Sequence, residues 1–103
     1  MRMMMKVRMP VEAGNKLAKD GTLGTKIEAI LKEQNPEAVY FGLDQGMRTA
    51  FVVVNMNDPS ELPKYAEPWF LAVNASMEAQ AVMKPEDLMK AGPAIGKAVE
   101  NHG

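Results

Sequence analysis

The sequence predicts an α+β domain built in the order strand, helix, strand, strand, helix, strand, followed by one more helix. Apolar and polar residues alternate with period two near the start, in the middle and in the last third of the chain, which is typical of strands. The segments between them carry apolar residues at helical spacing. The turn Asp44-Gln45-Gly46 joins the two middle strands directly. With 103 residues, the chain is expected to form a single domain over 1–103.

The first strand is expected over residues 3–9. Its apolar face carries Met3, Met5, Val7 and Met9. Lys6 and Arg8 lie on the other face, because side chains alternate along a strand. Pro10 ends the strand, since proline has no N–H to donate to a neighbouring strand.

The segment 11–34 has helical spacing with a weak point at Gly21 and Gly24. Each glycine inside a helix costs about 1 kcal/mol relative to alanine. We therefore predict two helices, over about 11–19 and 22–34, rather than one long helix.

The two middle strands are expected over 37–43 and 48–56, with Gly46 supplying the positive φ of the turn between them. The shortness of the turn fixes the register of this hairpin. The expected pairs are Leu43 with Arg48, Phe41 with Ala50, Tyr40 with Phe51, and Val39 with Val52.

The second helical region begins with a capping pattern, in which Asp58 is the N-cap and Glu61 is at position N3. One face of this helix is expected to carry Leu62, Ala66, Trp69 and Val73. This face predicts that Trp69 is buried against the sheet. Pro63 and Pro68 predict a helix that is kinked or divided into two short pieces.

The last strand is expected over 76–83, and Pro85 opens a final helix that ends near Ala91. Residues 91–103 are expected to be a weak helix or a frayed tail, since Gly92-Pro93 interrupts the pattern. The complete order is that of a ferredoxin-like βαββαβ sandwich with a C-terminal helix. In the usual strand order of that fold, the first and last strands are antiparallel neighbours.

The two faces of the predicted sheet differ in composition. The face expected under the helices carries Met5, Val7, Phe41, Val52, Val54, Ala79 and Ala81. The other face carries Met4, Lys6, Arg8, Tyr40, Thr49, Phe51, Val53, Asn55, Glu78, Gln80 and Val82. This second face is too apolar for bare solvent and too charged for a core. A second copy of the chain is the simplest cover, because two-fold dimers are the commonest oligomers.

The chain resembles the dimeric α+β barrel superfamily, and an uncharacterised small bacterial family within it. The resemblance is carried by residues 9–15, 20–23, 36–41, 48–51, 58–60 and 67–74. It implies a ferredoxin-like sandwich that pairs sheet to sheet as a homodimer. The wider superfamily includes cofactor-free monooxygenases, lactone isomerases, haem-degrading enzymes and ligand-sensing domains of regulators. None of the matching segments is a catalytic motif, so the catalytic residues stay unknown.

Several side chains are candidates for ligand binding. Arg48 could hold a carboxylate, and Tyr40 could hydrogen-bond or donate a proton. Strand parity places these two on opposite faces of the sheet. Trp69 either packs in the core or lines an apolar pocket beneath the sheet.

A polar group is expected where the first and last strands meet. It comprises Lys6, Arg8, Glu78 and Gln80. These residues form either a cross-strand ion pair or a polar ligand pocket inside the dimer.

Composition excludes several classes of partner and cofactor. The net charge is −1 with no basic block, which argues against nucleic acid and anionic membranes. There is no cysteine, and the single histidine is His102 near the end, so we expect no metal site and no haem. No phosphate-binding loop is present, and we expect no cofactor. The first residues lack the pattern of a signal peptide, so a cytoplasmic location is expected.

Three functions remain open at this point. The first is a homodimeric domain that binds a small, largely apolar or aromatic molecule with one polar group. The second is a cofactor-independent enzyme, of the monooxygenase or isomerase type, acting on such a molecule. The third is a structural or regulatory interaction domain.

Overall fold

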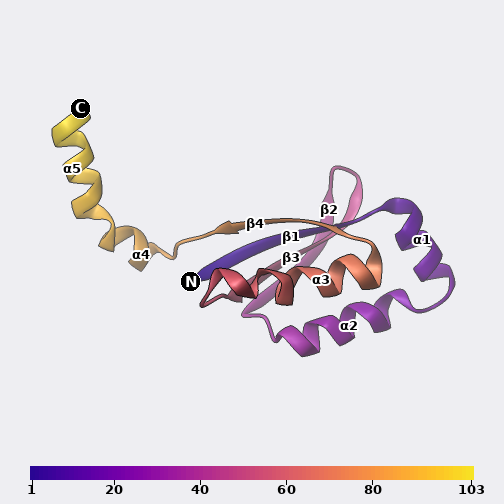
Figure 1. Cartoon of the computed structure of the whole chain (residues 1–103). Helices are drawn as coiled ribbons and strands as arrows, with labels where there is room; N and C mark the ends of the chain where they lie inside the picture. Colours follow the sequence, from indigo (N-terminus) through magenta and orange to yellow (C-terminus); the bar gives the residue numbers. More distant parts are fainter.

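Four strands form one antiparallel sheet in the computed structural model, which describes residues 1–103 (Figure 1). The strands are β1 (Arg2–Met9), β2 (Ala38–Asp44), β3 (Met47–Asn55) and β4 (Ser76–Ala81). Their order across the sheet is β2-β3-β1-β4, so the first and last strands are antiparallel neighbours as expected. The α+β class is confirmed, and this arrangement is compatible with a ferredoxin-like fold.

The helices α2 (Leu23–Gln34) and α3 (Leu62–Val73) lie on one side of the sheet, below it in Figure 1, and α1 (Val11–Lys19) lies at the right-hand end, where it leads into α2. The prediction of two helices before β2 is confirmed. The break between them contains Gly21, whose φ of 76° is accessible to glycine without a Cβ clash.

The β2–β3 hairpin has the predicted register, with Leu43 opposite Arg48 and Tyr40 opposite Phe51. Both central residues of its turn have positive φ, 53° at Gln45 and 75° at Gly46. This is the signature of a two-residue type I′ turn, whose twist matches that of the strands. From the sequence, a positive φ was expected only at Gly46.

The core lies between the helices and the two central strands. Its fully buried side chains include Met5, Val7, Val52, Val54 and Trp69. The expectation that the helices cover the whole of this face is wrong at both edges of the sheet. Phe41 in β2 is 56% exposed, and Ala79 and Ala81 in β4 are exposed, because the helices pack mainly over β1 and β3.

Helix α3 presents a different face to the core from the one expected. Tyr65, Trp69 and Val73 are buried, whereas Leu62 is exposed and Ala66 is only half-buried. The burial of Trp69 is confirmed. The Asp58 cap is also confirmed, and it opens a short 3₁₀ turn (Pro59–Glu61) that leads into α3.

Helix α3 is continuous through Pro68, so the alternative of two short helices is wrong. Proline has no N–H, and the carbonyl of Lys64 therefore loses its normal helical donor. The amide of Gln34, at the end of α2, supplies a replacement. Its Nε2 donates to the carbonyls of Tyr65 at 3.0 Å and Lys64 at 3.5 Å, and its Oε1 accepts from Trp69 Nε1 at 3.2 Å.

The residues after β4 form an extension that we call the C-terminal arm (82–103). It contains α4 (Pro85–Lys90) and α5 (Gly92–His102). The helices are separated at Ala91, close to the predicted break, but Gly92 and Pro93 themselves form the first turn of α5. None of the residues in these two helices is buried. The arm makes the molecule long, at 59 × 27 × 21 Å, with a radius of gyration of 17.1 Å. About 13 Å is typical of a compact domain of 100 residues.

None of the five helices combines the length and the apolar character needed to cross a membrane.

Candidate functional site

The face of the sheet opposite α2 and α3 is uncovered, and we call it the open face (Figure 1). The strand registers place its side chains in rows. One row, taken across the sheet from β2 to β4, consists of Tyr40, Phe51, Lys6 and Glu78. The next row consists of Ala38, Val53, Met4 and Gln80. The open face therefore has an apolar centre beside a polar edge.

A cluster of charges lies at one end of the open face. Arg8 Nε donates to Asp44 Oδ2, and Arg8 Nη2 donates to Glu78 Oε2 at 3.0 Å. Lys6 Nζ is farther from the same carboxylates, at 3.7 Å from Asp44 Oδ1 and 3.9 Å from Glu78 Oε2. The hydrogen bond from Arg8 holds the pKa of the Asp44 carboxyl below its usual value, and the charges of Arg8 and Lys6 act in the same direction.

Lys6 and Arg8 differ in what they have left to offer a ligand. The side chain of Arg8 is 11% exposed, and it already donates hydrogen bonds to two carboxylates, those of Asp44 and Glu78. The side chain of Lys6 is 34% exposed and has only the two long contacts. Lys6 is therefore the cation of the cluster that is best able to bind an added anionic group.

A small hollow lies beside this cation on the open face. It has a volume of about 60 Å³ and is lined by Met4, Lys6, Glu78 and Gln80. A water molecule occupies about 30 Å³ of liquid. The hollow in one chain is therefore large enough for one polar group of a ligand. A second protein surface over the open face is needed to enclose the remaining atoms of the ligand.

The structure brings together most of the side chains proposed from the sequence as ligand-binding. Lys6, Arg8, Glu78 and Gln80 are neighbours, and Tyr40 lies on the same face two strands away from Lys6 and is largely exposed. Asp44 belongs to the same cluster but was not predicted, because it was interpreted only as a turn residue. Asp44 is four residues after Tyr40 in β2, so the two side chains lie on the same face of the sheet. This spacing could have identified Asp44 from the sequence.

Arg48 and Trp69 lie elsewhere. Arg48 is on the helix side of the sheet, where its Nη2 donates to Asn15 Oδ1 at 3.0 Å and its guanidinium lies against Gly14 of α1. Trp69 is completely buried in the core and is hydrogen-bonded to Gln34. Neither side chain is near the polar cluster of the open face.

A second ionic group lies at the opposite end of β1. Arg2 makes a two-point contact with Glu37, in which Nε donates to Oε2 at 3.0 Å and Nη2 donates to Oε1 at 2.9 Å. Its Nη1 is 3.9 Å from Asp87 in the C-terminal arm. The hydrogen bond from Arg2 lowers the pKa of Glu37. Ion pairs thus bound the apolar centre of the open face at both ends.

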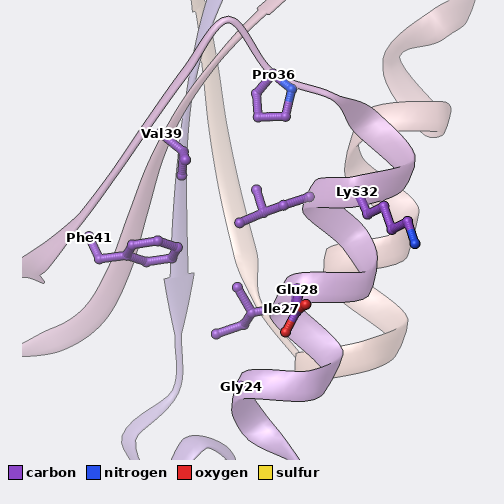
Figure 2. Close-up of a pocket in the computed structure, with 8 residues that line it drawn as sticks. Gly24, Ile27, Glu28, Lys32, Pro36, Val39 and Phe41 are labelled. Carbon is purple, nitrogen blue, oxygen red and sulfur yellow. The ribbon is translucent and has the colours of Figure 1, made fainter.

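The largest hollow lies on the other side of the sheet, between α2 and the edge strand β2, and we call it the α2–β2 groove (Figure 2). Its volume is about 780 Å³. It is lined by Gly24, Ile27, Glu28, Leu31, Lys32, Pro36, Val39 and Phe41. In Figure 2, Val39 and Phe41 of β2 and Ile27 of α2 project into the space between the two elements. The sequence did not predict this groove, because β2 was expected to be covered.

A smaller hollow of about 350 Å³ continues the groove, since Ile27 and Phe41 line both. It adds Leu43, which is strongly exposed. The apolar side of β2 is thus open along its length.

The chain matches no model of a known protein family and no curated protein. No group of three or more histidine, aspartate or glutamate side chains is placed to hold a metal ion.

Proposed function

We propose that the chain functions as a homodimer whose open faces pack together and enclose a binding site for a small, largely apolar molecule with one anionic or polar group. The observation that carries this proposal is the row Tyr40, Phe51, Lys6 and Glu78, which sets aromatic surface beside an incompletely paired cation. Sheet-to-sheet pairing of two ferredoxin-like sandwiches, as in a dimeric α+β barrel, fits this arrangement.

The composition of the open face supports pairing. Tyr40 is largely exposed in the single chain, and Met4 and Phe51 are half-buried. Packing two such faces would remove this apolar surface from water, with a gain of about 25 cal/mol for each Å² buried. The charged clusters at both ends stay close to the rim, where ion pairs keep part of their hydration. A cytoplasmic location is part of the proposal and fits a chain without cysteine.

The chemistry of the ligand follows from the groups that face the site. Lys6 would hold an anionic or strongly polar group, and the amide of Gln80 and the hydroxyl of Tyr40 would fix its orientation. Phe51 and Met4 would contact the apolar body of the ligand. Aromatic acids, quinones and lactones have this combination of features.

A thermal-shift screen of these three classes of compound tests the proposal. At least one compound should raise the melting temperature, by an amount set by RT ln(1 + [L]/Kd). Lys6→Met should abolish the shift for aromatic acids. Lys19→Met is the matched control, because Lys19 is exposed on α1, and it should leave the shift unchanged. If only divalent metals or nucleotides stabilise the chain, the proposed site is wrong.

A further inference from the structure

The C-terminal arm has helices but nothing to pack against. Leu88, Met89, Ile95 and Val99 are between 51% and 80% exposed. Helices α4 and α5 have six and eleven residues, and isolated helices shorter than about 12–15 residues are marginal in water. An arm that is helical along this length therefore needs an apolar partner surface.

The arm points away from the surfaces of its own chain. Val82 N donates to the carbonyl of Arg2 at 3.1 Å, and Asp87 lies near Arg2, so the arm is held to the body only at its root. Helices α2 and α3 lie on one side of the sheet, whereas α5 rises on the other side, beyond the end of β4 (Figure 1). This is the side of the open face, and the α2–β2 groove of the same chain is on the opposite side.

The α2–β2 groove has the size and character of a site for one more helix. Its apolar lining consists of Ile27 and Leu31 on α2 and Val39 and Phe41 on β2, and the charged side chains Glu28 and Lys32 of α2 also line it. Helix α2 has twelve residues and α5 has eleven, so at 1.5 Å per residue they are about 18 and 16.5 Å long. A helix lying beside α2 would cover the exposed side of β2 and complete the helical layer.

We infer that α5 of each copy packs into the α2–β2 groove of a second copy, so that the two chains exchange their C-terminal arms. This inference rests on the proposed pairing of the open faces, which places the second copy on the side to which the arm points. Packed sheets are about 10 Å apart, and α4 and α5 are separate helices of about 9 and 16.5 Å. The arm is thus long enough to pass the edge of the partner's sheet. In a two-fold dimer the same contact forms twice.

The chain has no cysteine, so disulfide cross-links can form only between cysteines that are introduced by substitution. A full-length chain carrying Ile95→Cys is co-expressed with a differently tagged chain carrying Phe41→Cys, and the purified protein is mildly oxidised. The inference predicts a disulfide-linked species containing one chain of each kind, identified by its mass. Leu71→Cys replaces Phe41→Cys in the control, because Leu71 is 84% exposed on α3 and outside the groove. The control should give no such species.

Other outcomes overturn the inference. A chain carrying both Ile95→Cys and Phe41→Cys that becomes an internally linked monomer would show that the arm folds back on its own body. A protein that is dimeric by light scattering but gives no mixed cross-link would leave the pairing of open faces intact and refute the exchange of arms. A monomeric protein would refute both.

A second measurement guards against loss of folding in the cysteine variants. Ile95→Asp should weaken dimerisation about tenfold or more, which corresponds to about 1.4 kcal/mol per factor of ten. Ala94→Asp introduces the same charge on a different face of α5 and should change dimerisation by less than about threefold, since substitutions of exposed residues usually have small effects. Equal effects of the two substitutions would contradict the inference.

Discussion

Gln34 is the side chain on which the contact between α2 and α3 depends. Its Nε2 donates to the carbonyl of Tyr65 at 3.0 Å and lies 3.5 Å from the carbonyl of Lys64, which Pro68 leaves without a helical donor, and its Oε1 accepts the hydrogen of the buried Trp69 indole. No buried polar side-chain atom in the structure is without a partner. The amide of Gln34 thus contacts both the backbone near Pro68 and the indole of Trp69, on the face of α3 that packs against the core.

Gln34→Ala should lower the free energy of unfolding by about 2–3 kcal/mol, because it leaves buried groups without partners. Urea denaturation followed by circular dichroism measures this loss. Glu33→Ala removes the neighbouring, exposed side chain of α2, and it should change stability by less than about 0.5 kcal/mol. Equal losses in the two variants would show that the Gln34 hydrogen bonds contribute nothing specific.

Asp44 and Glu37 make the stability of the domain sensitive to acid. The folded state lowers the pKa of each carboxyl through hydrogen bonds from Arg8 and Arg2. In the unfolded chain these carboxyls have a pKa of about 4. Because their pKa is lower in the folded state, they stabilise the fold above pH 4, and this stabilisation is lost as the pH falls through the folded-state pKa. Urea midpoints should thus be flat from neutral pH to about pH 5 and fall below about pH 4.

The matched test of this pH dependence is Asp44→Asn. The variant should be less stable than the original chain at neutral pH and should lose less stability on acidification, since one of the responsible carboxyls is gone. A variant with an unchanged acid slope would show that Asp44 does not contribute.

At the scale of single residues, the features that could be predicted from the sequence are those set by neighbouring residues in the chain. The register that pairs Tyr40 with Phe51 follows from strand parity and a short turn, and it is confirmed. The role of Gln34 could not be predicted, because a glutamine at the end of an amphipathic helix has the same local pattern whether it is buried or exposed. Its burial is decided by a carbonyl in α3, about thirty residues later in the chain.

At the level of elements, the start of α3 depends on a local cap. Asp58 accepts a hydrogen bond from the backbone N–H of Ser60 at 2.9 Å, and Glu61 accepts one from Asn57 at 2.6 Å. These contacts satisfy donors that the first turn leaves free. The cap also lowers the pKa of Asp58, through its hydrogen bonds with Ser60.

Asp58→Ala should destabilise the domain by about 1 kcal/mol, the usual effect of losing an N-cap. Asp58→Asn keeps an oxygen acceptor at the same place and should retain most of the stability. Thermal unfolding of the three proteins compares them directly. A loss in the asparagine variant as large as that in the alanine variant would point to charge rather than capping as the source of the stability.

The elements also show where prediction from sequence stops. Strand and helix positions were predicted closely because each has its own periodicity and its own ending residues, such as Pro10 and Gly46. The α2–β2 groove and the projecting arm were missed, because both depend on how far a helix layer extends over a sheet. The alternation of Val39, Phe41 and Leu43 predicts a strand with one apolar face, but it does not predict whether a helix covers that face.

At the scale of the whole molecule, the proposed dimer can be tested at Phe51, which lies in the centre of the open face. Phe51→Glu should give a monomer in analytical ultracentrifugation at micromolar concentration, because it would bury a charge between the two sheets. Phe70→Glu is the matched control, since Phe70 is partly exposed on α3. This control should sediment as a dimer. A wild-type chain with the mass of a monomer would refute the proposal.

The strand order also affects how a new chain folds. β1 is the first strand to be synthesised, yet it lies between β3 and β4 in the sheet. Met9 pairs with Arg48, and Met3 pairs with Ala81, so one side of β1 has no partner until nearly the whole domain has been translated. The β2–β3 hairpin closes a short loop and can form earlier. The methionine-rich β1 therefore keeps one free edge until β4 has been translated, and a free strand edge exposes the nascent chain to aggregation and to capture by chaperones.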